Sequence, residues 1–229
     1  MRALKISVAL LVVLLFVGDR VGAVVAAKVV ATRLQAVGSL PEKPDVTIRG
    51  WPFLTQAISG RYDRIELVAH DVKRHSIDLT TFEVTVRGAR IPLSAALGGH
   101  VPDVPAEGVT ARALIAYSDI AERSQLRGAS AVVAGQQVLV TGRFSVGGKV
   151  VVAQVLYGAE LTGSNLVLDP MTLDVKPKSP DAVRAVAPLL ALRIGLGTLP
   201  YGLRLTGIDI QAQGIMLSAK TGATVLQRP

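Results

Sequence analysis

Residues 61–90, RYDRIELVAHDVKRHSIDLTTFEVTVRGAR, decide the fold class of this chain. Over residues 64–69 and again over residues 82–87, apolar side chains largely alternate with charged or polar ones. A period of two residues places the apolar side chains on one face of an extended backbone, whereas a helix would need a period near 3.6. The stretch therefore predicts two strands of an antiparallel sheet with one buried face.

The rest of the chain extends this pattern. Apolar residues make up 50% of the 229 residues and aromatic residues only 4%, with 22 glycines and 12 prolines, a composition typical of strands and turns. Helices are predicted at residues 22–37, at residues 52–59 and at residues 179–194, where Ser179-Pro180-Asp181 provides a start signal and Pro188 a kink. Because strands outnumber helices and do not alternate strictly with them, an α+β fold is favoured.

The N-terminal segment is typical of an exported protein. Arg2 and Lys5 precede Ile6–Val17, a run of 12 uncharged residues that are all apolar except Ser7, and Asp19-Arg20 ends the run. Twelve residues is the length of a signal peptide, whereas a spanning helix needs about 20. Val21-Gly22-Ala23 is a suitable cleavage site, but helical spacing continues over residues 23–37 and would favour an uncleaved anchor. We therefore expect residues 1–23 to be a signal peptide or anchor and residues 24–229 to form a single domain outside the cytoplasmic membrane.

The charge of the chain favours an anionic partner. The net charge is +8, and the residues after Ala23 carry +6 of it. Nucleic-acid binding is disfavoured because aromatic stacking platforms are scarce, so anionic lipid headgroups or simple solubility are the remaining explanations. Since the chain has no cysteine, disulfides, thiolate catalysis and cysteine-based zinc sites are excluded.

A search for catalytic residues finds no convincing constellation. His70 and His75 are five residues apart in or beside a strand, which points them to opposite faces, and His100 stands alone in a loop. Neither a nucleophile elbow nor a phosphate-binding glycine loop is present. We therefore expect no catalytic residues, no metal site and no cofactor.

One segment does suggest lipid contact. Residues 48–63 contain the only tryptophan and are flanked by arginines, and an aromatic ring with a polar edge suits a membrane interface. The candidate lipid-binding residues are Arg49, Trp51, Phe53, Leu54, Arg61 and Arg64. We expect the aromatic part to lie at one end of the sheet beside an apolar groove. The competing interpretation is a buried plug at the end of the sheet, with Trp51 filling it.

The same segment resembles a known family. Residues 50–56 (GWPFLTQ) and 60–63 (GRYD), followed by an alternating strand, are similar to the hallmark of the LmeA-like family of actinobacterial envelope proteins, which are described as phospholipid-binding. Residues 199–206 (LPYGLRLT) are similar to its C-terminal signature. The resemblance covers essentially the whole chain, with Trp51 standing where the family usually has phenylalanine.

The resemblance implies a tubular lipid-binding fold, in which a curved antiparallel sheet wraps around a long N-terminal helix. It also implies binding of anionic phospholipid at a membrane surface, in support of envelope lipid or glycolipid assembly. The residues themselves agree, because Ala23, Ala26, Ala27 and Ala31 would leave space for an acyl chain between helix and sheet. The alternatives are an envelope scaffold with a filled core and, less favoured, an enzyme of envelope lipid metabolism.

Overall fold

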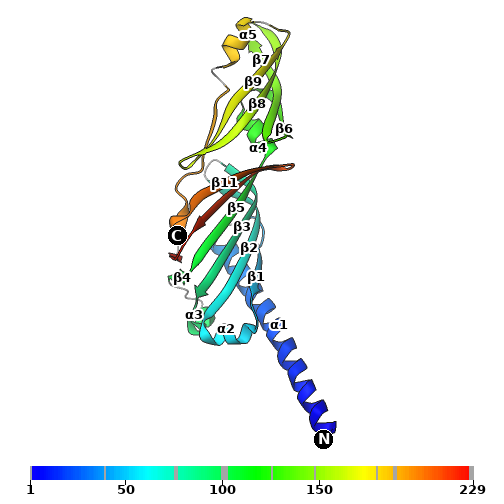
Figure 1. Ribbon diagram of the computed structural model, residues 1–229, viewed down its shortest axis with the longest axis vertical. Helices are drawn as coiled ribbons and strands as arrows, with labels where there is room; N and C mark the ends of the chain where they lie inside the picture. Colours follow the sequence, from blue (N-terminus) through cyan, green and yellow to red (C-terminus); the bar gives the residue numbers. More distant parts are fainter. Residues whose placement is uncertain are drawn as a thin grey trace. The chain divides into compact units, whose positions relative to one another are not determined.

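The computed structural model describes residues 2–38, 40–74, 77–98, 103–124, 126–146, 148–178, 180–187 and 190–226. It confirms the α+β class (Figure 1). Six helical segments lie in the described part of the chain: α1 (Arg2–Gly38), α2 (Phe53–Ser59), α3 (Leu93–Gly98), α4 (Tyr117–Arg123), α5 (Pro180–Val186) and the 3-10 turn η2 (Pro200–Gly202). The predictions about His75, His100, Ser179 and Pro188 lie outside the described residues.

Most of the remaining residues form strands. Their bounds are β1 (Asp45–Arg49), β2 (Arg61–Arg74), β3 (Ile77–Arg90), β4 (Val104–Ala106), β5 (Gly108–Ala116), β6 (Arg127–Ala134), β7 (Gln137–Val146), β8 (Lys149–Thr162), β9 (Asn165–Lys176), β10 (Leu192–Gly195), β11 (Arg204–Gln211), β12 (Gly214–Thr221) and β13 (Thr224–Leu226). The stretch that opened the sequence analysis is the β2–β3 pair, as its alternation predicts.

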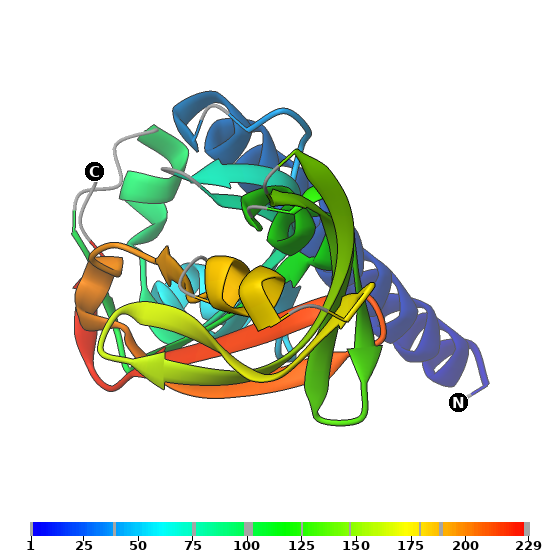
Figure 2. The same cartoon turned by 90° about the horizontal axis from the view of Figure 1, so that it is seen from above.

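The strands form three sheets. A six-stranded sheet has the order β1-β2-β3-β5-β12-β11, a five-stranded sheet has the order β10-β9-β8-β7-β6, and β13 pairs with β4. The pairs β1–β2, β6–β7, β7–β8, β8–β9 and β9–β10 are antiparallel. The sheets are antiparallel where their pairing is described, and one of them is strongly curled into a half-barrel, which confirms the expected curved antiparallel sheet (Figure 2).

The N-terminal apolar run and the alanine-rich segment form one uninterrupted helix. α1 has 37 residues, a length of about 55 Å at 1.5 Å per residue. It is long and apolar enough to cross a membrane, although a signal sequence passes the same test. Its large apolar side chains between Leu4 and Val17 are 49–70% exposed, whereas Ala23, Ala27 and Ala31 are buried. Only the second half of α1 is therefore part of a packed structure.

The chain divides into two compact units. Unit 1 comprises residues 1–70, 83–111 and 220–229, and it contains α1, β1 and α2. Its core is small and consists of Ala23, Phe53, Ala57, Tyr62 and Ala89. The rings of Phe53 and Tyr62 are tilted by 42° with centroids 6.5 Å apart, a favourable aromatic geometry.

Unit 2 comprises residues 71–82 and 112–219 and has a much larger core. Its fully buried side chains come from strands and from α4, and they include Ile115, Ile120, Tyr157, Leu166 and Leu168. Burial raises the pKa of the Tyr157 hydroxyl to about 12, so the side chain is neutral at physiological pH.

The helix predicted over residues 179–194 is shorter than the sequence pattern indicates. α5 ends at Val186, and residues 192–195 form β10, which pairs with β9. In β10, buried Leu192 and Ile194 alternate with exposed Arg193 and Gly195, the period of a strand and not of a helix, so this part of the predicted helix is wrong. Leu192 and Ile194 are then buried by strand pairing with Leu168 and Leu166.

Candidate lipid-binding groove

A groove of about 660 Å³ lies in unit 1 between α1 and β1. α1 contributes one face of it and β1 with the preceding residues 43 and 44 contributes the other. The apolar part of the lining comes from Ala23, Val24, Ala27, Ala31, Pro44, Val46 and Ile48. A groove of this volume is within the range of small-molecule sites in proteins.

The floor of the groove follows from the spacing of small residues in α1. Ala23, Ala27 and Ala31 are four residues apart, so they lie one above another on the same helix face. A methyl group is too short to fill the distance between a helix axis and a strand, which is commonly about 10 Å for packed elements. The expected gap between helix and sheet is therefore present, and Ala26 packs instead against the unit 1 core.

The rim of the groove is basic. Arg20, Lys28, Lys43 and Arg49 line it, against the single acidic residue Asp45. Arg49 is paired with Glu66 through an Nε–Oε2 distance of 3.0 Å. Lys28 and Lys43 are exposed, and their ammonium groups have no ion-pair partner within the described ranges. The rim thus offers two lysines to an anion at the edge of an apolar cavity.

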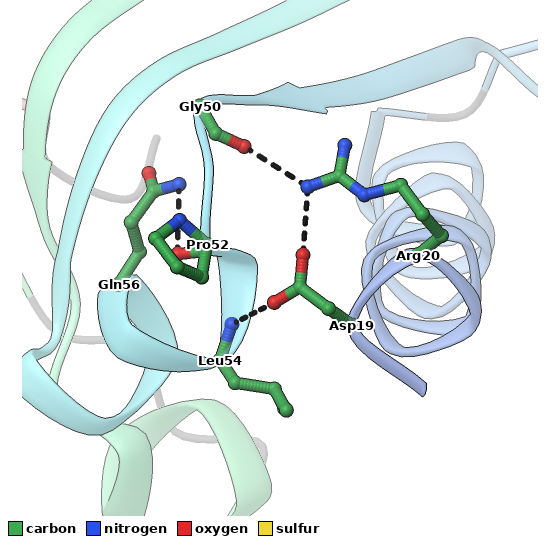
Figure 3. Close-up of polar contacts among 6 residues, drawn as sticks. All are labelled: Asp19, Arg20, Gly50, Pro52, Leu54 and Gln56. Atoms are coloured by element: carbon green, nitrogen blue, oxygen red, sulfur yellow. Dashed lines mark hydrogen bonds and ion pairs between the residues drawn. The ribbon is translucent and has the colours of Figure 1, made fainter. Parts of the chain in front are cut away.

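A polar contact fixes α1 to α2 at one end of the groove (Figure 3). The Asp19 side chain is buried at 3% exposure, and its Oδ1 accepts the backbone N–H of Leu54 at 2.8 Å. Its Oδ2 pairs with Arg20 Nη2 at 2.7 Å, and the same nitrogen donates to the carbonyl oxygen of Gly50 at 3.4 Å. Asp19 therefore caps the N-terminus of α2, where backbone N–H groups have no partner within the helix.

Gln56 connects α2 to the sheet. Its side chain is buried, and its Oε1 accepts the N–H of Asp63 at 2.9 Å. Its Nε2 donates to the Pro52 carbonyl at 3.5 Å (Figure 3). Gly50 is required beside it, because its φ is +106° and a Cβ there would lie 2.5 Å from Gln56 Nε2. The segment before α2 is therefore fixed by Arg20 of α1, which contacts Gly50, and by Gln56 of α2, which contacts Pro52.

Comparison with protein-family models identifies the chain. Residues 17–220 match the model described as LmeA-like phospholipid-binding. The chain belongs to the LmeA-like phospholipid-binding family. The comparisons with curated proteins and with solved structures gave no significant match. The resemblance inferred from the sequence is confirmed, and phospholipid binding is the property that describes the family.

The match to the LmeA-like family includes the end of the apolar run. Its first matched residue, 17, precedes Asp19 and Arg20, so the matched region contains the contact between α1 and α2. Cleavage of the chain after Ala23 would remove Asp19 from this contact and Ala23 from the alanine floor of the groove.

The six candidate residues chosen from the sequence have different surroundings. Arg49 lines the groove. Phe53 is 6% exposed and belongs to the unit 1 core, whereas Trp51 is 67% exposed and Leu54 is 42% exposed. Arg61 pairs with Glu107 at 3.0 Å, and Arg64 lies 3.7 Å from Glu66. The structure therefore brings only one of the six to the groove and leaves Trp51, two residues before α2, and Leu54, in its first turn, exposed.

Sequence reasoning missed the residues that form the basic rim. Arg20, Lys28 and Lys43 were not selected because they are separated in sequence from the aromatic segment. One signal was available: Arg20 precedes Ala23 by three residues and Lys28 precedes Ala31 by three residues, so both lie beside the alanine face of α1. Lys43 had no such signal, since its position depends on how the chain returns from α1 to β1.

The described residues offer no grouping of three or more histidine, cysteine, aspartate or glutamate side chains suited to a metal ion. His70 is exposed on β2.

Proposed function

We propose that this protein is a non-catalytic phospholipid-binding protein that holds an anionic lipid in the α1–β1 groove. The observation that carries the proposal is the combination of an alanine floor with a rim that contains Lys28 and Lys43, neither of which forms an ion pair with another described residue. The apolar volume suits part of an acyl chain, because each buried CH₂ contributes about 0.8 kcal/mol. Lys28 and Lys43 suit the phosphate of the headgroup.

The second part of the proposal concerns location. Arg2 and Lys5 precede the apolar run, and positive residues on that side favour a cytoplasmic N-terminus with the rest of the chain exported. Packing of Asp19, Gly22 and Ala23 on α2 supports retention of α1 as an anchor, because cleavage after Ala23 would remove all three. The protein would then present lipid at the outer face of one membrane, in support of envelope lipid or glycolipid assembly.

We further propose that residues 24–229 act as one lipid-binding domain with the end of the anchor packed onto it. β2, β3 and β5 each contribute residues to both unit 1 and unit 2. Because these strands run without interruption, unfolding of one unit would disrupt the backbone pairing of the other, and a single cooperative transition is expected.

The experiment that tests lipid binding uses the full-length protein, purified from membranes and analysed for co-purified lipid by mass spectrometry. The double variant Ala27→Phe/Ala31→Phe fills the groove and should lose the lipid. Val25→Phe/Val29→Phe is the matched control, since these side chains are exposed on the same helix and do not line the groove. Equal lipid content in both variants would show that the groove is not the site.

The charge preference is tested with vesicles of anionic or zwitterionic lipid. Lys28→Gln/Lys43→Gln should reduce the preference for anionic lipid, whereas Lys149→Gln/Lys178→Gln, at exposed positions in unit 2, should not. The preference should also weaken with salt, because the Debye length falls from about 10 Å at 0.1 M to about 3 Å at 1 M. Intact mass of the purified protein reports whether residues 1–23 are present.

A further inference from the structure

The surface of α2 that faces away from the unit 1 core carries unusually exposed apolar side chains. Trp51 is 67%, Leu54 42% and Ile58 76% exposed, and Leu93 at the start of α3 is also exposed. Leu54 and Ile58 are four residues apart and share one helix face, while Phe53, Gln56 and Ala57 occupy the buried face. We call Trp51, Leu54, Ile58 and Leu93 the α2 surface.

The α2 surface has cationic residues at its edge. Ile58 and Leu93 line a recess of about 420 Å³ together with Arg61 and Arg90. Both arginines are exposed, and they stand where β2 begins and β3 ends. Apolar side chains bordered by arginines, with a tryptophan beside them, match the chemistry of a membrane interface, where rings and aliphatic groups meet the acyl region and cations meet phosphates.

The position of α1 determines which partner can reach the α2 surface. The hydrogen bond from Leu54 N–H to Asp19 holds the first turn of α2 at the point where α1 leaves the packed part of unit 1. A Cβ added at Gly22 would lie 3.4 Å from the Phe53 ring and 3.8 Å from the Leu54 side chain, so the two helices are in close contact. A bilayer that surrounds the exposed apolar half of α1 would therefore reach to the side of α2.

The length of the apolar part of α1 places that boundary more closely. Residues 4–17 span only about 20 Å, whereas the hydrocarbon core of a bilayer is about 30 Å thick. The exposed face of α1 remains apolar beyond Asp19, at Val21, Val24 and Val25. Residues 4–25 span about 32 Å, so covering the whole apolar face of α1 brings the edge of the hydrocarbon core to Val25, about 9 Å beyond Asp19. α2 contacts α1 at Asp19 and Gly22, so it then lies at this edge or just inside it.

We propose that the α2 surface rests in the outer interface of the bilayer, with Trp51, Leu54 and Ile58 inserted among the lipids and Arg61 and Arg90 at the headgroups. This inference rests on the proposed retention of α1 as an anchor, but not on lipid binding in the groove. Docking by α2 sets the height of unit 1 above the membrane, so that the basic rim of the groove meets headgroups directly.

Trp51 provides the test, because it is the only tryptophan of the chain and its fluorescence reports one position. Full-length protein is reconstituted into vesicles of anionic phospholipid, with and without lipids brominated on the acyl chain. The emission of Trp51 should be blue-shifted relative to its emission in the unfolded protein without detergent, and the brominated lipids should quench it. Emission that is unquenched by brominated lipid yet quenched by aqueous iodide would overturn the proposal. Protection from both quenchers would also overturn it, since the surface would then be covered by protein.

Three variants separate the possible causes of quenching. Leu54→Glu/Ile58→Glu should lose most of the quenching while α1 keeps the protein in the vesicles. In Trp51→Phe/Val37→Trp the tryptophan moves to an exposed residue of α1, 18 residues or about 27 Å beyond Asp19, and quenching should be absent. If Val37→Trp is quenched as strongly as Trp51, the quenching is not specific to α2 and the proposal fails.

The remaining variant distinguishes this proposal from the lipid-binding one. Ala27→Phe/Ala31→Phe fills the groove, and quenching of Trp51 should persist in it. Loss of quenching in this variant would mean that brominated lipid in the groove was the quencher, which overturns docking and leaves the groove proposal intact. Recovery of protein that lacks residues 1–23 from the membranes would instead remove the anchor on which docking depends.

Discussion

Unit 1 and unit 2 are built from similar elements but pack in different ways. The core of unit 2 consists of large side chains such as Ile115, Leu166 and Leu168, which are entirely buried. The core of unit 1 contains three alanines and two aromatic residues, and the neighbouring α1–β1 interface is lined by alanines that leave a groove. Unit 2 therefore has a fully packed core, whereas unit 1 leaves unfilled space at the α1–β1 groove, where we propose that a lipid binds.

The strongest test of this comparison removes a large side chain from unit 2. Leu166→Ala should lower the free energy of unfolding by about 2–5 kcal/mol, because a fully buried leucine leaves a cavity that the surrounding structure fills only in part. Urea denaturation measures the change. The lipid content of the folded fraction should match that of the wild type. Loss of lipid without loss of stability would contradict the assignment of stability to unit 2 and of lipid binding to unit 1.

A second test uses the buried hydroxyl of Tyr157 in unit 2. Its pKa is about 10 when unfolded and about 12 when folded, so between these values the unfolded state loses the proton first. Stability from this group is therefore complete below about pH 10 and is lost as the pH rises toward 12, by up to about 2–3 kcal/mol for two pKa units. A pH series of urea midpoints should fall more steeply for the wild type than for Tyr157→Phe, and parallel curves would contradict the shift.

A third test addresses the contact that holds α1 to α2 in unit 1. Asp19→Ala removes the acceptor for the Leu54 N–H and the partner of Arg20, so the melting temperature should fall. The fall should be smaller than for Leu166→Ala, because no large cavity forms. Asp19→Asn, which keeps an acceptor oxygen but loses the charge, should lie between the alanine variant and the wild type.

The smallest effect is expected at Trp51. Because this side chain is largely exposed, Trp51→Ala should change the free energy of unfolding by no more than about 0.5 kcal/mol. Phe53→Ala, two residues away and buried against Tyr62, should cost about 3–5 kcal/mol. Comparable losses for the two variants would mean that Trp51 fills the end of the sheet as a plug.

The sequence by itself determined the elements whose signals are local. Alternation over residues 64–69 and 82–87 specified β2 and β3, and Gly60 ended the helix predicted over residues 52–59 where α2 ends. The unbroken helical pattern from the apolar run through residue 37 specified α1. The motifs at residues 50–63 and 199–206 also indicated the family. These features follow from backbone preferences and periodicity, which need no distant partner.

Only the tertiary structure decided which side chains meet. Residues 192–195 have helical as well as strand character, and pairing with β9, some 27 residues earlier at Leu166–Leu168, made them a strand. Trp51 and Phe53 are equally apolar in sequence, yet one is exposed and the other buried, because the position of α2 depends on a hydrogen bond to Asp19 35 residues away. Lys43 reaches the groove rim in the same way, through the return of the chain from α1 to β1. Burial and site assembly are set by contacts between residues distant in sequence, and periodicity carries no information about those contacts.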